Sequence, residues 1–181
     1  MNKKDKTALL MPKYRFACIL DVTARDLEKM GAKAVGLDID NTIAPDGTMK
    51  FIDGIQQWIE SIVAAGFPVT LISNGTIARV GYISKFLGGV PYVHLSLKPS
   101  PFGLKKAAKR MGVDITELAM LGDQLFSDIK AANLCGAIPV RIDPLPAKSL
   151  YPHYYEWKGR REKPIISEFE KLHGYGVYDD D

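Results

Sequence analysis

The sequence has 181 residues, of which 46% are hydrophobic and 25% are charged, and its formal net charge is +3. This length suits one domain whose core needs no disulfides, and the composition excludes a disordered, collagen-like or coiled-coil chain. The positive charge is too small for a strongly basic nucleic-acid-binding protein, so we expect no nucleic-acid partner.

Strand and helix signals alternate along the chain. Short apolar runs predict strands, and apolar residues at helical spacing predict helices. In chain order we expect a helix over 23–30, a strand over 34–38, a helix over 53–65, a strand over 67–72, a helix over 77–86, a strand over 92–95, a helix over 102–111, a strand over 118–122, a helix over 127–133 and a strand over 137–142. This alternation predicts a three-layer α/β/α sandwich around a mostly parallel, Rossmann-like sheet.

Polar side chains follow four of the predicted strands, at the edge where parallel sheets bind their ligands. In chain order these are Asp38, Asp40 and Thr42, then Ser73 and Asn74, then Lys98, and finally Asp123 and Asp128. Converging carboxylates repel one another unless a cation lies between them, and an all-oxygen ligand set favours a hard ion such as Mg²⁺. A lysine and a hydroxyl beside that ion would bind phosphate oxygens. The pattern therefore predicts phosphoryl chemistry at this edge.

These residues resemble the four motifs of the haloacid dehalogenase superfamily. The matching segments are DIDNT at 38–42, SNG at 73–75, Lys98, and GDQLFSD at 122–128. An Asp at position 40 resembles the phosphatase branch and argues against a dehalogenase. Over most of residues 12–145 the chain is more closely similar to the YqeG family of small bacterial phosphatases, in subfamily IIIA. The segments GLDIDNTIAP, LISNG, KPSPFGLKKAAKRMG and LGDQLFSDIKAAN carry this similarity.

The resemblance implies a Mg²⁺ cofactor and a ligand set for it. Asp38 is implied as a metal ligand and as the nucleophile that forms an aspartyl-phosphate. Asp40 is implied as the general acid and base, with its backbone carbonyl as a second ligand. Asp123 is implied as a direct ligand, and Asp128 as a partner acting through water or Lys98. Without the resemblance, Asp128 could simply cap the following helix.

The resemblance also implies which residues bind the phosphoryl group. Ser73 supplies the hydroxyl, and the backbone N–H of Asn74 lies beside it. Lys98 neutralises the charge of the nucleophile and the phosphate, so it counts both as a catalytic and as a binding residue. Thr42 supports them with its hydroxyl. Asn74 alone could equally be a turn residue.

No separate cap domain is expected, because only about 30 residues separate Thr42 from Ser73, enough for one connection and one helix. An open site favours a large substrate, such as a lipid head group or a phosphoprotein. Mitochondrial relatives in the broader group act on phosphatidylglycerophosphate, so the resemblance implies a lipid phosphate substrate. Soluble sugar or nucleotide phosphates are the alternative substrates, and a binding or regulatory module without turnover is the alternative class.

Residues 146–181 are interpreted as an extension of a single domain that spans residues 1–181. In this extension four aromatic residues precede four cations: Tyr151, Tyr154, Tyr155 and Trp157, then Lys158, Arg160, Arg161 and Lys163. Either the aromatics pack on the core and the cations are solvated, or the segment contacts an anionic membrane. Apolar residues at 165, 166, 169 and 172 predict a terminal helix.

The remaining features concern location. The sequence has no apolar run of about 18 residues, so we expect no membrane-spanning helix. Neither Cys18 nor Cys135 has metal-ligand spacing, and we expect both to be small buried residues, as suits a reducing compartment. We therefore expect a cytoplasmic protein, peripheral to the inner face of the membrane if its substrate is a lipid.

Overall fold

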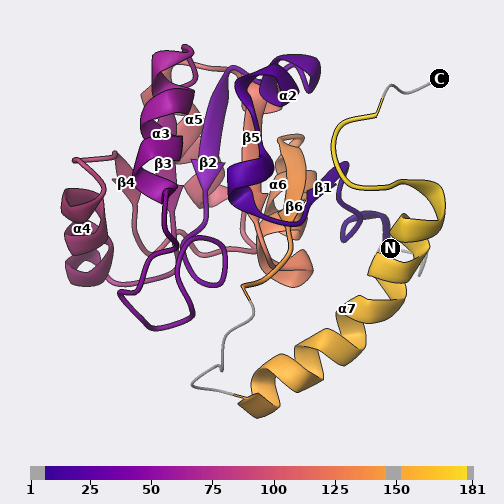
Figure 1. Ribbon diagram of the computed structural model, residues 1–181. Helices are drawn as coiled ribbons and strands as arrows, with labels where there is room; N and C mark the ends of the chain where they lie inside the picture. Colours follow the sequence, from indigo (N-terminus) through magenta and orange to yellow (C-terminus); the bar gives the residue numbers. More distant parts are fainter. Residues whose placement is uncertain (1–6, 146–151, 179–181) are drawn as a thin grey trace.

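The computed structural model describes residues 7–145 and 152–178 (Figure 1). Six parallel strands form one sheet in the order β1-β6-β5-β2-β3-β4. They are β1 (Tyr14–Phe16), β2 (Ala34–Leu37), β3 (Val69–Ile72), β4 (Tyr92–Val93), β5 (Leu118–Gly122) and β6 (Ile138–Ile142). The four inner strands are buried along their whole length, which is the pattern of a parallel sheet covered on both faces.

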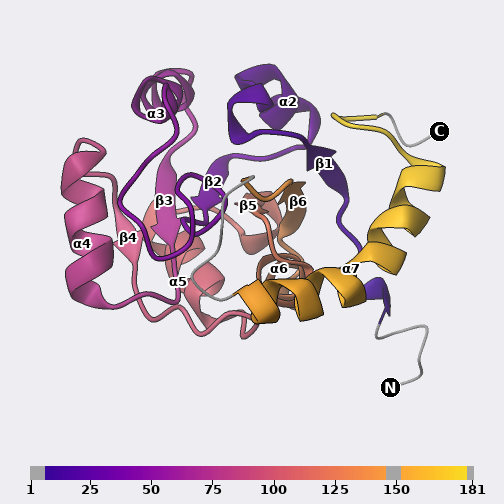
Figure 2. The same ribbon diagram turned by 60° about the horizontal axis from the view of Figure 1, so that its bottom comes forward.

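Helices cover both faces of this sheet. Among the described residues, five helices do so, α2 (Ala24–Lys29), α3 (Ile55–Ala64), α4 (Ile77–Phe86), α5 (Phe102–Met111) and α6 (Lys130–Cys135), and a further helix, α7 (Pro152–Leu172), lies beside the sheet (Figure 1). Apolar side chains of α2, α3 and α4 share one buried cluster with one face of the sheet, and those of α5 and α6 share a second cluster with the other face. Figure 2 shows the sheet between α2 and α3 above and α5 and α6 below. The expected three-layer sandwich is thereby confirmed.

Local sequence signals explain where these helices begin and which face they bury. Thr23 precedes α2 and forms a capping box with Asp26: its hydroxyl oxygen accepts a hydrogen bond from the Asp26 N–H, and its own N–H donates to the Asp26 carboxylate. The buried stripe of α3 includes Trp58, whose indole N–H donates to the Val22 carbonyl at 2.8 Å. Burying one such large apolar side chain stabilises the fold by about 1.5–3 kcal/mol.

Most predicted elements are present within a residue or two of their expected bounds. Strand β4 ends at Val93 rather than at residue 95, because Leu95 has a φ of 44°, which leaves the extended region. The helix expected over 127–133 is a π-helical turn, Leu125–Ile129, followed by α6. Strand β1 was not predicted. Cys18 and Cys135 are unpaired and half-buried rather than fully buried.

The connections between the inner strands hold no inserted domain. Residues 38–68 contain α3, and residues 73–91 contain α4. Two short 3₁₀ turns, Ile19–Asp21 and Ile115–Glu117, complete the described elements. The expectation that the chain lacks a cap between its motifs is met. Within the described ranges no helix is long and apolar enough to cross a membrane.

Helix α7 lies along the side of the sheet formed by β6 and β1 (Figure 1). After α7 the chain returns to β1, where the Gly176 N–H donates to the Arg15 carbonyl at 2.8 Å. Phe169 is buried, whereas Leu172 is exposed. The expected terminal helix is confirmed, although it begins earlier than the apolar spacing indicates.

The aromatic and basic residues of this helix divide between core and solvent. Arg160 and Lys163 are exposed, as the solvated interpretation requires, but Lys158 is buried, so that interpretation is wrong at this position. Trp157 is half exposed and lies against the Arg161 guanidinium rather than in the core. Tyr151 and the side chains of Tyr154 and Tyr155 lie outside the described residues.

Candidate active site

The carboxyl ends of β2 and β5 bring three aspartates and one lysine together. Asp38 follows β2, Asp123 follows β5, and Asp128 lies in the π-helical turn after it. One oxygen of each carboxylate lies within 4.8 Å of the others, and all three side chains are buried. The Lys98 ammonium lies 2.6 Å from Asp38 Oδ1 and 2.7 Å from Asp128 Oδ1. Residues up to 90 positions apart in sequence thus form one charged cluster.

Lys98 is held in this position by its backbone as well as by its side chain. Its ammonium also donates to the Ile72 carbonyl at 2.7 Å. The Asn74 amide accepts hydrogen bonds from the Lys98 N–H and the Ser96 hydroxyl, and it donates to the Lys98 carbonyl. The side chain of Asn74 therefore clamps the lysine loop onto the end of β3, in addition to lining the cavity beside Asp38.

The cluster fits a hard divalent cation. Its ligand atoms are carboxylate oxygens, which is the donor set that Mg²⁺ prefers. Asp123 Oδ1 is buried and has no hydrogen-bond partner within the described residues, a costly condition unless a cation or donor reaches it. Asp40 is not part of this carboxylate group, so only its backbone carbonyl could serve as the expected second ligand.

The pKa shifts in the cluster follow from burial and mutual repulsion. Burial and the neighbouring Asp128 charge raise the pKa of Asp38 well above its ordinary value, against the opposing effect of Lys98. Burial raises the pKa of Asp123 to about 7, although Lys158 favours its ionised form. Burial alone would lower the pKa of Lys98, but the charges of Asp128 and Asp38 outweigh it and raise the pKa. These carboxylates are therefore stabilised in their ionised form by added positive charge.

The backbone of β5 and the turn after it set the position of Asp128. Gly122 packs so closely that an added Cβ would lie 2.4 Å from the Asp128 Cγ. The same carboxylate accepts the Gln124 N–H at 3.0 Å. A glycine at the end of β5 is thus required for Asp128 to fold back toward Lys98.

Asp40 points toward a different partner. Arg79, on α4, donates to both of its carboxylate oxygens, at 2.9 and 2.6 Å, and the Gly47 N–H donates to one of them. This two-bond arrangement fixes the plane of the Asp40 carboxylate at the rim of the site. Arg79 was not predicted as a site residue. Its place in the first turn of the helix after SNG is the signal that could have identified it.

The two predicted hydroxyl residues lie at the same edge. Thr42 is buried, and its hydroxyl donates to Asp38 Oδ2 at 3.4 Å. Ser73 is buried as well, and its oxygen accepts the Gly75 N–H at 3.0 Å. Between these motifs lies a cavity of about 70 Å³ that is lined by residues of all four segments, including Asp38, Asp40, Asn74, Lys98 and Asp128. Its size suits a compact group such as a phosphoryl group rather than a whole substrate.

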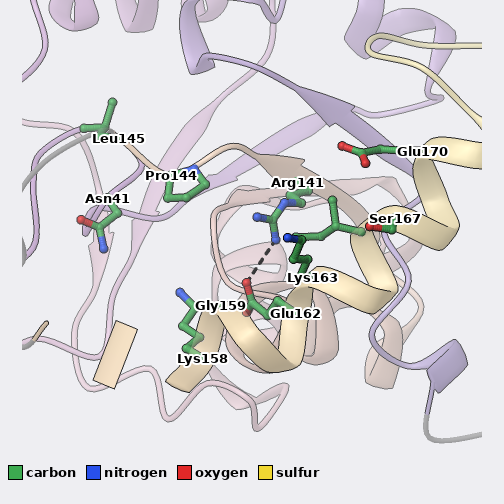
Figure 3. Close-up of a pocket in the computed structure, with 11 residues that line it drawn as sticks. Asn41, Arg141, Pro144, Leu145, Lys158, Gly159, Glu162, Lys163, Ser167 and Glu170 are labelled. Carbon is green, nitrogen blue, oxygen red and sulfur yellow. Dashed lines mark hydrogen bonds and ion pairs between the residues drawn. The ribbon is translucent and has the colours of Figure 1, made fainter. Parts of the chain in front are cut away.

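Helix α7 contributes charged residues that the motif pattern does not include. The buried Lys158 ammonium lies 3.1 Å from Asp123 Oδ2. One turn later, the buried Glu162 accepts the Leu125 N–H at 3.0 Å and pairs with Arg141 of β6 at 3.4 Å. Figure 3 shows these side chains between α7 and the sheet. Lys158 and Glu162 are one helical turn apart, so their spacing in the sequence could have indicated that they lie on the same face of a helix.

Comparisons with known proteins show what this chain is similar to. Residues 8–136 match the family model of the haloacid dehalogenase-like hydrolases. The chain is 28% identical to the probable phosphatase YqeG of Bacillus subtilis strain 168 over 131 residues, 70% of this chain and 73% of that protein. It is 33% identical to the phosphoglycolate phosphatase of Neisseria meningitidis over 85 residues, which cover 42% of this chain and 36% of that one.

A solved structure shares the fold. It is the cobalt-bound form of the deoxy-D-mannose-octulosonate 8-phosphate phosphatase (YrbI) from Haemophilus influenzae. The TM-score is 0.53 at 16% sequence identity, and the similarity covers 77% of this chain and 92% of that chain. This likeness concerns the fold, which the chain shares with that structure over 77% of its own length.

Proposed function

The chain belongs to the haloacid dehalogenase-like hydrolases, and we propose that it is a Mg²⁺-dependent phosphatase that cleaves phosphomonoesters through an aspartyl-phosphate on Asp38. The observation that carries the proposal is the buried cluster in which Lys98 contacts Asp38 and Asp128. One carboxylate oxygen of Asp123 lies within 4.8 Å of oxygens of both these aspartates. A lysine beside a carboxylate nucleophile balances the charge that an incoming phosphate brings.

In the proposed reaction, a carboxylate oxygen of Asp38 attacks phosphorus as the bond from phosphorus to the ester oxygen breaks. Asp40, oriented by Arg79, gives its proton to the departing oxygen. Asp40 then takes a proton from water, which attacks phosphorus and restores Asp38. Ser73, Lys98 and the backbone N–H of Asn74 bind the phosphoryl oxygens during both steps.

The proposed metal ligands are Asp38, Asp123 and the backbone carbonyl of Asp40. Asp128 acts through Lys98, which it contacts at 2.7 Å. When bound, Mg²⁺ supplies positive charge that screens the nucleophile from the phosphate oxygens. The orphaned Oδ1 of Asp123 supports this assignment, because a buried carboxylate oxygen without a donor is satisfied by a cation.

We propose phosphatidylglycerophosphate as the first substrate to test. The resemblance to mitochondrial phosphatases of that lipid supports it, as does the absence of a cap between the motifs. On this proposal the enzyme works in the cytoplasm at the inner face of the membrane, in phospholipid synthesis. Soluble phosphate esters remain the competing substrates, in keeping with the phosphoglycolate phosphatase name of one relative.

Phosphate release with Mg²⁺ tests this function. The panel holds phosphatidylglycerophosphate in micelles, sugar phosphates, nucleotides and a chromogenic aryl phosphate, with Asp38→Asn as the control. We expect turnover that needs Mg²⁺ and disappears in Asp38→Asn. Full turnover by Asp38→Asn would show that Asp38 is not the nucleophile. Mg²⁺ binding without turnover of any ester would favour a binding module.

A further inference from the structure

A second, larger cavity adjoins the carboxylate cluster. It has a volume of about 450 Å³ and lies between α7 and the chain that leaves β6 (Figure 3). Cavities of this size hold small organic ligands. All of α7 lies beyond the segment that matches the family model, so this cavity is formed largely by the part of the chain that the family motifs do not describe.

One side of the cavity borders the proposed reaction site. Asn41, next in sequence to Asp40, lines it, and so does Lys158, whose ammonium contacts Asp123. Figure 3 shows Asn41 and Lys158 on one side of the cavity and Ser167 and Glu170 on the other. A substrate with its phosphoryl group at Asp38 could therefore extend its remaining atoms along α7.

The charges that face the cavity favour an anionic ligand. Arg141 is buried, and its contacts with Glu162 and Asp143 are long, at 3.4 and 3.5 Å. A guanidinium has five N–H donors and charge-assisted bonds are usually about 2.7–2.9 Å, so these contacts leave Arg141 weakly satisfied. Lys163 adds a second cation to the lining.

The two carboxylates in the lining are already engaged. Glu162 accepts the Leu125 N–H, and Glu170 pairs with Arg15 of β1 at 2.5 Å. The lining holds three cations, Arg141, Lys158 and Lys163, against these two acids. Pro144, Leu145 and Ile166 complete the lining with apolar surface, which suits a short carbon chain.

We propose that this cavity binds the part of the substrate beyond its phosphoryl group, and that this part carries a second anionic group on a short carbon chain. The inference rests on the proposed phosphatase function and names the substrate class for it. Arg141 and Lys163 recognise the second anion, and α7 takes the selective role that a cap would otherwise have.

Matched substrate pairs test the inference. Glycerol 3-phosphate and 3-phosphoglycerate differ by a carboxylate, and fructose 6-phosphate and fructose 1,6-bisphosphate differ by a phosphate. We expect kcat/KM to favour the member with the second anion in at least one pair, and the responding pair identifies the anion. Lys163→Glu should lower kcat/KM about tenfold for the substrate with the second anion, the effect of roughly one lost charged contact. It should change kcat/KM for the other substrate of that pair less than about twofold.

Two further variants sharpen the result. Lys171→Glu makes the same charge change on the exposed end of α7, outside the cavity lining, and should leave the preference intact. Arg141→Lys keeps the charge but loses the guanidinium fork, so it should weaken the preference while the protein stays folded. Equal kcat/KM within both pairs, or equal effects of Lys163→Glu and Lys171→Glu, would overturn the inference.

A binding experiment separates this inference from the phosphatase function. Calorimetry on Asp38→Asn compares the affinity for 3-phosphoglycerate with that for glycerol 3-phosphate, and for the fructose pair, without turnover. Preference for the second anion that Lys163→Glu removes supports the cavity even if no ester is hydrolysed. Turnover of the aryl phosphate without any such preference, in binding or in kcat/KM, supports the phosphatase alone and refutes the cavity assignment.

Discussion

Lys158 and Asp123 form a buried ion pair, 3.1 Å from the ammonium nitrogen to Oδ2, although Lys158 lies on α7 and Asp123 directly follows the central strand β5. Asp123 belongs to the carboxylate cluster, so a helix outside the motif segments balances part of the charge of the proposed metal site. The contact therefore links the packing of α7 against the sheet to the charge of that site.

Lys158→Met should therefore destabilise the protein in a metal-dependent way. Without metal, the variant leaves Asp123 buried without this ammonium, and we expect the free energy of unfolding to fall by about 3 kcal/mol. Saturating Mg²⁺ should reduce this loss, because the cation replaces the missing charge. Urea unfolding in EDTA and in Mg²⁺ measures both values. Lys163→Met, which removes an exposed cation of the same helix, is the control, and an equal loss in EDTA and Mg²⁺ would contradict the coupling.

Gly122→Ala should disturb the site through packing alone. Its Cβ would overlap Asp128, and we expect a loss of about 1–3 kcal/mol in stability together with most of the activity. Gly174→Ala provides the contrast, since its Cβ meets nothing within 4 Å and the residue lies outside the cavity lining. Urea unfolding and aryl phosphate turnover check the pair; a fully active Gly122→Ala would show that Asp128 need not hold this position.

Arg79→Gln should impair the proposed acid and base. Asp40 would lose both guanidinium bonds, and its carboxylate would no longer be fixed toward the cavity. We expect kcat to fall by about 10²-fold, the lower end of what general acid–base catalysis contributes, and the pH profile of kcat to change. Arg79→Lys should retain part of the activity. Unchanged kcat and an unchanged pH profile in Arg79→Gln would mean that Arg79 does not position Asp40.

Asp143 should make stability depend on pH. Burial would raise its pKa, but hydrogen bonds from Arg15 and Tyr175 outweigh burial and hold the pKa below the ordinary value. A lowered folded pKa stabilises the protein above the unfolded value of about 3.9, and this contribution is lost as the pH falls through the folded pKa.

Comparing wild type with Asp143→Asn measures this contribution. We expect the variant to be less stable by about 1–3 kcal/mol at pH 7, the range for charged hydrogen bonds, and the difference to shrink toward pH 3. Asp53→Asn, at an exposed position, should show no such trend. A difference between wild type and Asp143→Asn that stays constant from pH 7 to pH 3 would exclude the ionised carboxylate as its source.

The inner sheet could be predicted from sequence because its strands are apolar runs bounded by turn residues. Strand β5 and helices α4 and α5 have the bounds that their apolar spacing indicates. Strand β1 escaped prediction because it has three residues with Arg15 at its centre, and that arginine is buried only because Asp143 and Glu170 neutralise it. Such a pairing depends on residues more than 120 positions away, which no local pattern contains.

The candidate site also has a part that the sequence predicts and a part that it does not. Asp38, Lys98, Asp123 and Asp128 follow strands whose carboxyl ends must meet, so topology alone brings them to one edge. Arg79 and Lys158 come from helices, where a cation usually faces solvent and its partner depends on how the helix packs. Sequence spacing alone does not place the Asp40 side chain. Although Asp40 is only two residues from Asp38, its carboxylate pairs with Arg79 and is not part of the carboxylate group.

The two outer strands have a consequence for how copies of this chain behave in concentrated solution. Strand β4 has two residues and β1 three, and β1 has its outer side engaged by Gly176 from beyond α7. Exposed strand edges are the usual starting point for intermolecular β-pairing and aggregation. A sheet that begins and ends in such short, partly covered strands offers a second molecule almost no backbone to extend.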